Sequence, residues 1–424
     1  MTRIDLPYGR QVLPISLPDS CLAWVITPQP VKPAADACSL VASALDRPIG
    51  TLPLSQLVKP GQTLAVIVDD YSRKTPVALF LPLVLERLHM AGMRQADIRL
   101  VMALGTHRPM TEDELDAKLG SAVAAEYEIV NLPSTAASEM VYLGMASNGI
   151  PAWVHRVVAE ADVRIGLGMI TPHMDAGFSG GAKIILPGVC SAQTVDAFHA
   201  ASAFIPMNQL GNVESPLRRN LEQFVAERVP LDFIVNVVLT LDGEIYQCVA
   251  GHPVQAHRIG VEYAKAVFGV QVKGRYPVVV ANCHPYDVDL WQSAKGAFCG
   301  DLITADGGTL VLVTAAPEGN SSYPLVPHYA GRNPDALKRE IQSGQVEDAK
   351  QAVGGIQFTT LKSRLNLALV SAGLTRGDAM AIGMSYFETV ETAVAEAVSR
   401  LATSERSKSV AVIPQAGIVL PLVM

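Results

Sequence analysis

The sequence predicts an α/β protein of two domains, each with a mostly parallel sheet covered by helices. Short runs rich in Val, Ile and Leu alternate with amphipathic stretches along the chain. At 424 residues, the chain is too long for one ordinary core. Apolar residues make up 49% of it, charged residues 17%, and the mean hydropathy is +0.27. These values fit strands that are buried on both faces of a sheet.

Four apolar runs predict the strands of the first domain. Stretches with helical periodicity separate them, and this β-α-β alternation favours parallel pairing. The runs are TLAVIVDD (63–70), DIRLVMALGTH (97–107), EYEIV (126–130) and ADVRIGLGMITPH (161–173).

Helix signals lie between these strands. Pro76 suits the first turn of a helix after the first strand, and Gly92 suits its C-terminal end. After the second strand, Thr111 and Glu114 have the spacing of a capping box, in which each side chain bonds the other residue's backbone N–H. Each helix would lie on one face of the sheet and connect two parallel strands.

A second region of the same type follows a connector at residues 268–277, which has the Gly, Lys and Pro content of a linker. We therefore expect a first domain over residues 1–270 and a second over 271–404. The final segment, 405–424, is apolar enough to form another buried strand, and it could return to the first domain. Strand-like runs of the second region are 277–285, 308–319 and 364–373, and residues 387–402 are helical in pattern.

Composition argues against several classes of function. The net charge of −7 and the lack of a Lys/Arg run make nucleic acid an unexpected partner. The first 20 residues lack a continuous apolar segment, and no later run has the length of a membrane span, so we expect a cytoplasmic protein. The six cysteines form no C-x-x-C pair, which favours buried thiols over metal ligands.

Polar side chains follow three of the predicted strands in the first domain. Because ligands bind beyond the carboxyl ends of parallel strands, these residues could converge in one crevice. They are Asp69, Asp70, Arg73, His107, Arg108, His173 and Lys183.

Each of these residues also has a structural interpretation. Either aspartate could cap a helix, and Arg73 could simply pair with them. His107 could be an ordinary loop histidine. The presence of His173 at a comparable strand end favours chemistry for both, because neutral imidazole is suited to proton transfer near pH 7.

The segment GFSGGAK (177–183) could cradle a phosphate, since glycines let backbone N–H groups approach closely and Ser179 adds a hydroxyl. It is not a Walker motif, because the spacing differs and Ile184 follows the lysine. A desolvated Lys183 would have a lowered pKa and could act as a nucleophile or form a covalent cofactor link. The alternative is an amphipathic lysine at a domain surface.

Two further helices carry candidate ligands. His199 lies on a predicted helix over residues 192–203 and is a candidate metal ligand, although a lone helical histidine is usually structural. In the second domain, Gln292 and Lys295 are three residues apart on one helical face. An amide and a cation there suit a carboxylate, and the alternative is a solvated helix start.

Taken together, these motifs resemble those of the lactate racemase family, whose members carry a nickel-pincer nucleotide. The correspondence runs in order from about residue 66 to 296, and GFSGGAKIILPGV is its most specific part. The motifs are VDDYSRKTP, GTHRPM, TPHMDAGFSGGAKIILPGV, FHA and WQSAKG.

The resemblance implies the cofactor, pyridinium-3-thioamide-5-thiocarboxylic acid mononucleotide with nickel, and proteins that synthesise it as partners. It implies that Lys183 forms the covalent attachment and that His199 completes the nickel coordination. The residues expected to contact the nucleotide are Asp70, Ser179, Gly180 and Gly181.

The resemblance also implies the reaction, inversion of C2 of a 2-hydroxy acid by proton-coupled hydride transfer. His107 and His173 would be the two acid–base residues, one on each face of the substrate. Arg73 would orient the substrate, while Gln292 and Lys295 would hold its carboxylate. Hydride transfer avoids a carbanion beside a carboxylate, because the planar 2-keto acid can take hydride back on either face.

Two positions depart from a lactate pocket. Where lactate racemases enclose the substrate methyl group, this chain has Asp175 and Trp291. An unpaired carboxylate facing a methyl would be costly, so we expect a larger or more polar substrate such as an aldonate, and not a dicarboxylate. In the alternative, Asp175 points away and pairs with an arginine. The competing functions are racemisation of lactate itself, another hydride or proton transfer on a sugar acid with this cofactor, and non-catalytic binding of a hydroxy acid.

Overall fold

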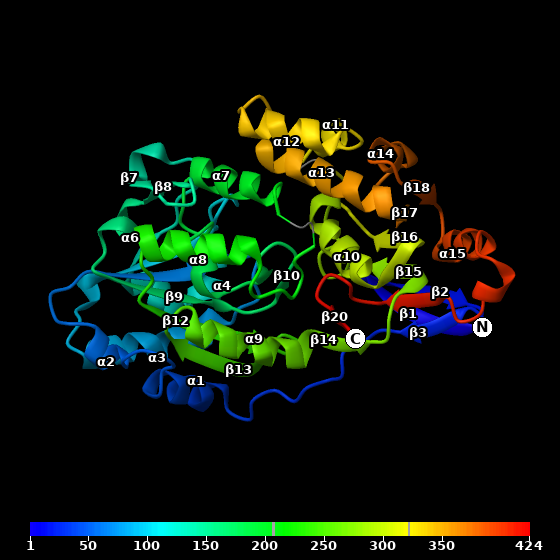
Figure 1. Ribbon diagram of the computed structural model, residues 1–424. Helices are drawn as coiled ribbons and strands as arrows, with labels where there is room; N and C mark the ends of the chain where they lie inside the picture. The colour runs from blue at the N-terminus through cyan, green and yellow to red at the C-terminus, as the bar shows by residue number, and fades with distance from the viewer. Residues whose placement is uncertain (206–207, 321–322) are drawn as a thin grey trace.

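The computed structural model describes residues 1–205, 208–320 and 323–424. In the described chain, the first sheet has the strand order β13-β12-β9-β4-β5-β6, of which Figure 1 labels β13, β12 and β9. Neighbouring strands are parallel except β12 and β13, which confirms the mostly parallel sheet expected from the sequence. The strands are β4 (Leu64–Asp69), β5 (Ile98–Ala103), β6 (Glu128–Val130), β9 (Val163–Met169), β12 (Phe233–Leu239) and β13 (Ile245–Gly251).

Helices cover both faces of this sheet because its strands carry apolar side chains on both sides. In β4, Ala65 and Ile67 belong to one core cluster, whereas Leu64, Val66 and Val68 belong to the other. The first cluster includes side chains of α7 (Ala192–Ser202), α8 (Pro216–Arg228) and α9 (Gln255–Phe268), and the second those of α1 (Ala37–Asp46), α3 (Val77–Met90) and α4 (Glu112–Leu119).

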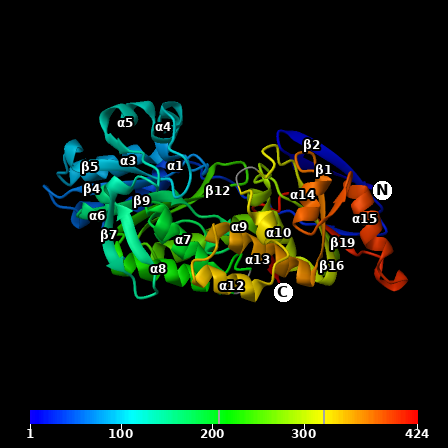
Figure 2. The ribbon, with the colours of Figure 1, turned by 90° about the horizontal axis from the view of Figure 1, so that it is seen from above.

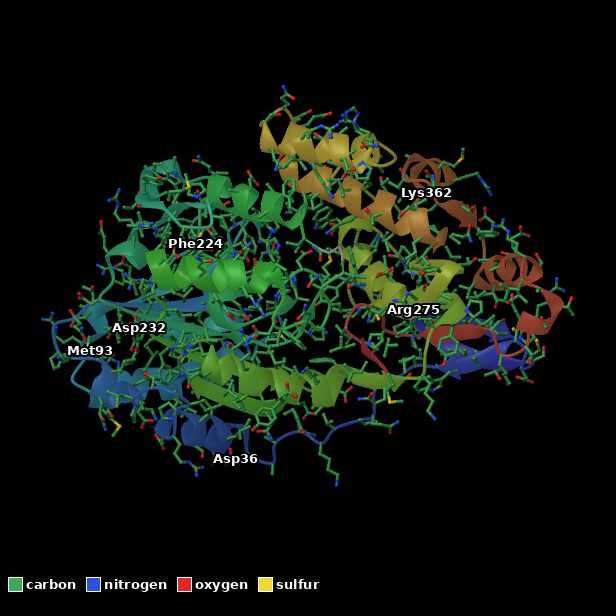
Figure 3. All side chains as sticks on the ribbon, viewed as in Figure 1. Asp36, Met93, Phe224, Asp232, Arg275 and Lys362 are labelled. Carbon is green, nitrogen blue, oxygen red and sulfur yellow. The ribbon has the colours of Figure 1, made fainter. Side chains whose placement is uncertain are left out.

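The helix ends follow local signals. The side chain of Asp36 accepts a hydrogen bond from Ser39 N (3.0 Å) at the start of α1, on the outer surface (Figure 3). Thr111 and Glu114 form the predicted capping box at α4. Pro76 is the residue immediately before α3 rather than within its first turn.

The second sheet is parallel throughout its described strands, in the order β18-β17-β16-β15-β19-β3. Val279 and Ala281 of β15 face one core cluster, and Val278 and Val280 face another. The strands are β3 (Leu22–Val25), β15 (Tyr276–Asn282), β16 (Thr304–Thr314), β17 (Asn366–Ser371), β18 (Ser385–Phe387) and β19 (Val410–Ile413).

The two faces of the second sheet are covered differently. Helices α10 (Leu290–Ile303) and α13 (Ala349–Arg364) cover one face. The other face is covered by α15 (Val390–Ser399) and by the N-terminal hairpin of β1 (Thr2–Tyr8) and β2 (Gln11–Leu17). Figure 2 shows this hairpin at the end of the molecule that also carries α15.

The division of the chain differs from the expected one at both ends. Residues 1–25, expected in the first domain, contribute β3 to the second sheet and form the separate hairpin that packs on its face. Within 405–424, β19 joins the second sheet, and β20 (Leu420–Val423) pairs with β14 (Gly269–Val272) and places Leu420 in the core beside the first sheet. Short segments of four to seven residues carry no sequence signal that says which sheet they will join. The terms first lobe and second lobe below denote the elements around the first and the second sheet.

The lobes meet where α13 packs beside α7. Ala352, Val353 and Ile356 of α13 share a core cluster with Ala203, which follows α7.

The other elements are α2 (Leu54–Leu57), α5 (Ser121–Glu126), α6 (Arg156–Glu160), β7 (Met140–Met145), β8 (Pro151–His155), β10 (Pro172–His173), β11 (Gly177–Phe178), α11 (Val326–Tyr329), α12 (Pro334–Gln342), α14 (Arg376–Ala381) and four short 3₁₀ turns. Across the described ranges, helices long and apolar enough to cross a membrane are absent.

Candidate active site

A cavity of about 830 Å³ lies between the lobes, at the carboxyl ends of strands from both sheets. Gly181 is the one predicted site residue that does not line it; its N–H donates to Asn236 Oδ1 (2.8 Å). The predicted residues that line the cavity are Asp69, Asp70, Arg73, His107, Arg108, His173, Asp175, Ser179, Gly180, Lys183, His199, Trp291, Gln292 and Lys295.

The loops after β4 and β5 bring Asp70 to His107. The carboxylate Oδ2 lies 2.5 Å from His107 Nδ1, and Oδ1 accepts from Ser72 Oγ (2.6 Å). Burial raises the pKa of Asp70, but the bonds from His107 and Ser72 outweigh it and hold the pKa below its usual value. Asp70 is therefore an ionised partner that orients the imidazole, rather than a cap of α3.

Asp69 and Arg73, which lie on either side of Asp70 in the sequence, bond other residues. Asp69 forms a buried ion pair with Lys118 (2.6 Å) and accepts a bond from Thr75 (2.5 Å). Arg73 Nη1 donates to Ser72 Oγ (3.2 Å) and lines the cavity. Asp69 is thus part of the scaffold, whereas Arg73 presents a cation to the cavity.

The turn between β10 and β11 places His173 beside Lys183. Nε2 of His173 lies 3.1 Å from Nζ of Lys183, and Nδ1 accepts from the N–H groups of Asp175 (3.2 Å) and Ala176 (3.4 Å). Burial, followed by the charge of Lys183, holds the pKa of His173 well below its usual value. Burial and the charge of Arg218 lower the pKa of Lys183 to about 7. Both groups can therefore be neutral near physiological pH.

His199 has the tautomer that a metal ligand needs. Its Nδ1–H donates to the carbonyl of Val195, one turn earlier on α7 (2.9 Å), so the lone pair is on Nε2. Burial lowers the pKa of His199 to about 3, so a proton does not compete for that lone pair at neutral pH. Neutral imidazole suits nickel, and the side chain lines the cavity.

The glycine turn beside Lys183 packs closely against its neighbours. Gly180 has φ of +75°, and a Cβ there would lie 2.8 Å from both Asn236 Oδ1 and Ile170 Cγ1. Ser179 is fixed by a bond from its hydroxyl to the carbonyl of Met169 (2.9 Å). Only glycine therefore fits at position 180, and both Ser179 and Gly180 line the cavity.

The second lobe contributes a cation and an amide from α10. Lys295 Nζ donates to Gln292 Oε1 (2.8 Å) and lies 3.5 Å from the centroid of the Tyr286 ring. Asp289 caps the helix by accepting from Gln292 N (2.6 Å). Burial, followed by the charges of Arg73 and Lys183, holds the pKa of Lys295 well below its usual value. An anion beside these groups would relieve that repulsion.

Asp175 and Trp291 both line the cavity. Among the described residues, the hydrogen-bond partner of the Asp175 carboxylate is Gln357 Nε2 on α13 (3.5 Å), not an arginine. Burial raises the pKa of Asp175, opposed by the charge of Lys183 and the bond from Gln357. Trp291 stacks on Tyr323, with ring centroids 4.3 Å apart.

Sequence reasoning missed several residues of this site. Lys350 of α13 donates to the hydroxyl of Tyr323 (2.6 Å) and lies 3.4 Å from Thr106 of the first lobe. His284, which follows β15, lines the cavity with Nδ1 3.2 Å from Asp287. A histidine directly after a predicted strand is a signal that could have identified His284, whereas Lys350 depends on how the lobes pack.

The fold and cavity define a class of two-lobed α/β proteins with two histidines, a lysine of lowered pKa and a third histidine suited to metal binding in one interlobe site. Residues 8–211 match the family model described as the lactate racemase N-terminal domain. The chain is 31% identical over 326 residues to the lactate racemase of Thermoanaerobacterium thermosaccharolyticum and 32% identical over 325 residues to that of Lactiplantibacillus plantarum, covering 76% of each chain in both cases. The chain belongs to the lactate racemase family and is an isomerase of the racemase and epimerase type.

Solved structures agree with this assignment. The lactate racemase apoprotein of T. thermosaccharolyticum superimposes with a TM-score of 0.87 at 26% identity, covering 99% of this chain and 100% of that one. A Thermotoga maritima protein superimposes with a TM-score of 0.63 at 20% identity, covering 88% and 96%, which shows the shared fold alone. Family membership implies a nickel-dependent cofactor.

Proposed function

We propose that this protein inverts C2 of a 2-hydroxy acid that is larger or more polar than lactate. The observation that carries the proposal is the convergence of His107, His173, Lys183 and His199 on one cavity, from four separate segments of the first lobe. Mere binding of a hydroxy acid would not need two imidazoles and a lysine whose pKa is lowered to about 7.

The residues of the cavity fit a nickel-pincer nucleotide. Lys183 would attach it covalently, since a neutral amine is a nucleophile, and His199 Nε2 would ligate the nickel. Asp70 and the Ser179–Gly181 turn would lie beside the nucleotide. When bound, this group supplies a reversible acceptor for the hydride of the substrate's C2 carbon.

The proton chemistry belongs to the two histidines. Asp70 holds His107 through Nδ1, so Nε2 is the atom that can take the proton of the substrate hydroxyl. In His173, the backbone N–H groups bond Nδ1, so a neutral ring carries its hydrogen on Nε2. It would take a hydroxyl proton at Nε2 only after that hydrogen moves to Nδ1 and the bonds of 3.2 and 3.4 Å to the backbone are released. Two imidazoles could serve the two enantiomers in turn, each returning its proton when the hydroxyl is re-formed.

The substrate carboxylate would bind Lys295 and Gln292, with Arg73 opposite them on the first lobe. All three side chains line the cavity. The pKa of Lys295 is held well below its usual value by burial and by neighbouring cations, and a bound carboxylate would raise it. Binding of the anion therefore lowers the electrostatic repulsion within the site.

The wall beyond this carboxylate site favours a polyhydroxy chain, such as that of an aldonate. Asp175 can accept hydrogen bonds from hydroxyl groups, because its recorded side-chain contact is a single long bond from Gln357. A second carboxylate on the substrate would be repelled when Asp175 is ionised. Lactate is the alternative substrate, but it would leave Asp175 facing a methyl group.

The test is proton NMR of the cofactor-loaded enzyme, produced together with cofactor-synthesis proteins, with single enantiomers of 2-hydroxy acids from lactate to aldonates. We expect a C2-inverted product from an aldonate and little or none from lactate. Inversion of lactate alone would keep the reaction and reject the substrate proposal. Absence of inversion across the panel, with nickel confirmed in the protein, would reject the proposed function.

A further inference from the structure

The loop from Ala176 to Gly180, which connects His173 to Lys183, folds around one side chain. Arg218 of α8 donates to three of its carbonyl oxygens: Nε to Ala176 (3.2 Å), Nη1 to Gly180 (3.2 Å) and Nη2 to Phe178. Carbonyl dipoles that point to one place repel each other unless donors lie between them. The planar guanidinium offers five N–H groups in a fixed fork, which matches this arrangement.

Arg218 is fully buried, at 0% exposure, where arginines are rarely found. Burial lowers its pKa to about 10, so it stays charged at neutral pH. Its counter-charge is Glu222 (3.8 Å), which Arg258 of α9 holds with two bonds of 2.8 Å. Figure 1 shows α8 above the first sheet. Ala176 and Phe178 of the loop belong to the core cluster that also contains Leu217 and Leu221 of α8. A buried charge is costly, so its position needs a reason beyond packing.

Other groups hold the same loop at further atoms. His257 Nε2 donates to the carbonyl of Ser179 (2.8 Å), and the N–H of Ser179 donates to the carbonyl of Thr171 (2.8 Å). At Gly177, where φ is +72°, an added Cβ would lie 2.1 Å from the carbonyl oxygen of Asn212. These contacts restrain the conformation of the loop. Arg218 bonds more of its carbonyl groups than any of these other groups does.

We propose that Arg218 is a positioning residue that fixes the loop 176–180, and through it the placement of Lys183 beside His173. The proposal rests on the proposed role of Lys183 as the attachment residue. The charge of Arg218 acts in the same direction, because after burial it is the largest influence that lowers the pKa of Lys183. Lys183 also faces the charged or titratable groups of Arg73, His173, Asp175, His199 and Lys295.

The test uses the purified full chain without cofactor and has two readouts. The first is hydrogen exchange of the amides of residues 177–181, and the second is the pH midpoint of Lys183 acetylation by acetic anhydride, followed by mass spectrometry. Arg218→Gln should speed exchange by about tenfold or more and raise the midpoint by about one pH unit. Arg219→Gln is the matched control, because its side chain is 68% exposed on the same helix, and both readouts should stay at wild-type values.

Arg218→Lys separates geometry from charge. Lysine keeps the buried cation but cannot bridge three carbonyls, so exchange should remain fast while the midpoint returns towards the wild-type value. If the amides of residues 177–181 exchange at the wild-type rate in Arg218→Lys, the proposal is overturned. This result decides the question even if Arg218→Gln does not fold. Neither readout needs cofactor or turnover, so failure of the NMR test above would not be mistaken for failure here.

Discussion

Nε2 of His173 lies 3.1 Å from Nζ of Lys183, and the hydrogen bonds at Nδ1, on the other side of the ring, determine which of these two atoms donates. The N–H groups of Asp175 and Ala176 both donate to Nδ1, so a neutral His173 carries its hydrogen on Nε2. That hydrogen points to Lys183, which can accept it only as a free amine. The geometry and the pKa of about 7 therefore agree that Lys183 is poised as a nucleophile.

The first prediction is that covalent cofactor retention requires Lys183. A chain produced with cofactor-synthesis proteins should show the added cofactor mass under denaturing conditions, and Lys183→Ala should show none. Lys74→Ala is the control, since Lys74 lines the same cavity and should keep the full mass. Full cofactor mass on Lys183→Ala would reject the attachment role.

The second prediction concerns the pH dependence of this attachment. Lys183 is protonated below a pKa of about 7 and neutral above it, so its reaction with an electrophile should accelerate as pH rises through 7 and level off above 8. An ordinary exposed lysine would continue to accelerate towards pH 10. Acetylation rates of Lys183 in the cofactor-free chain, read by peptide mass spectrometry, measure this. A rate that still rises steeply at pH 9 would contradict the lowered pKa.

The third prediction is that both histidines are needed for interconversion. His107→Ala and His173→Ala should each lower kcat by about 10²–10⁴-fold while the cofactor mass and nickel content stay unchanged. Asp70→Asn should have a smaller effect, because it disturbs the orientation of His107 without removing it. His328→Ala, on the exposed surface of α11, is the control. Rapid racemisation by either alanine variant would reject the two-base scheme.

Much of this site could be predicted from the sequence because strand ends are predictable. Strands β9, β4 and β5 are adjacent and parallel, so residues just after them must meet at one edge of the sheet. That rule alone brings together Asp70, His107 and His173. The Thr111 and Glu114 pattern likewise depends on local spacing, and the structure has the capping box at that helix.

The remainder depends on packing between distant segments. Gln357 and Lys350 lie within α13, and nothing in the local pattern says that this helix reaches the first lobe. The placement of β3 in the second sheet is equally non-local, since it pairs with β19, almost 400 residues later. The burial of Arg218 had one signal in the sequence. Its neighbour Leu217 and the later Leu221 have the spacing of a buried helical face.

The fourth prediction is that His199 is the protein's nickel ligand. His199→Ala should lower bound nickel per chain by about tenfold or more, since even outer partners of metal ligands change affinity by about 10–100-fold. Covalent cofactor mass on Lys183 should persist, because attachment is a separate bond. Elemental analysis of nickel and intact mass measure the two quantities on one sample. Wild-type nickel in His199→Ala would show that the metal is held without this imidazole.

The fifth prediction is that Asp175 selects the substrate. Hydrogen bonds to a charged acceptor contribute about 1.5–3 kcal/mol, so Asp175→Ala should lower kcat/KM for an aldonate by about 10–150-fold. The same change removes a carboxylate from the cavity wall, so activity towards lactate should stay level or rise. Gln357→Ala should give a weaker shift in the same direction, because its 3.5 Å bond orients Asp175 without contacting the cavity.

The direction of this change distinguishes selectivity from general damage. If Asp175 only supports the backbone, both substrates should lose activity in parallel, and their ratio should not move. Asp175→Asn keeps the size of the side chain and tests the charge, since an amide can still accept a hydrogen bond but no longer repels a second carboxylate. We therefore expect Asp175→Asn to keep part of the aldonate activity and to gain activity on a dicarboxylic 2-hydroxy acid, measured by the same NMR assay.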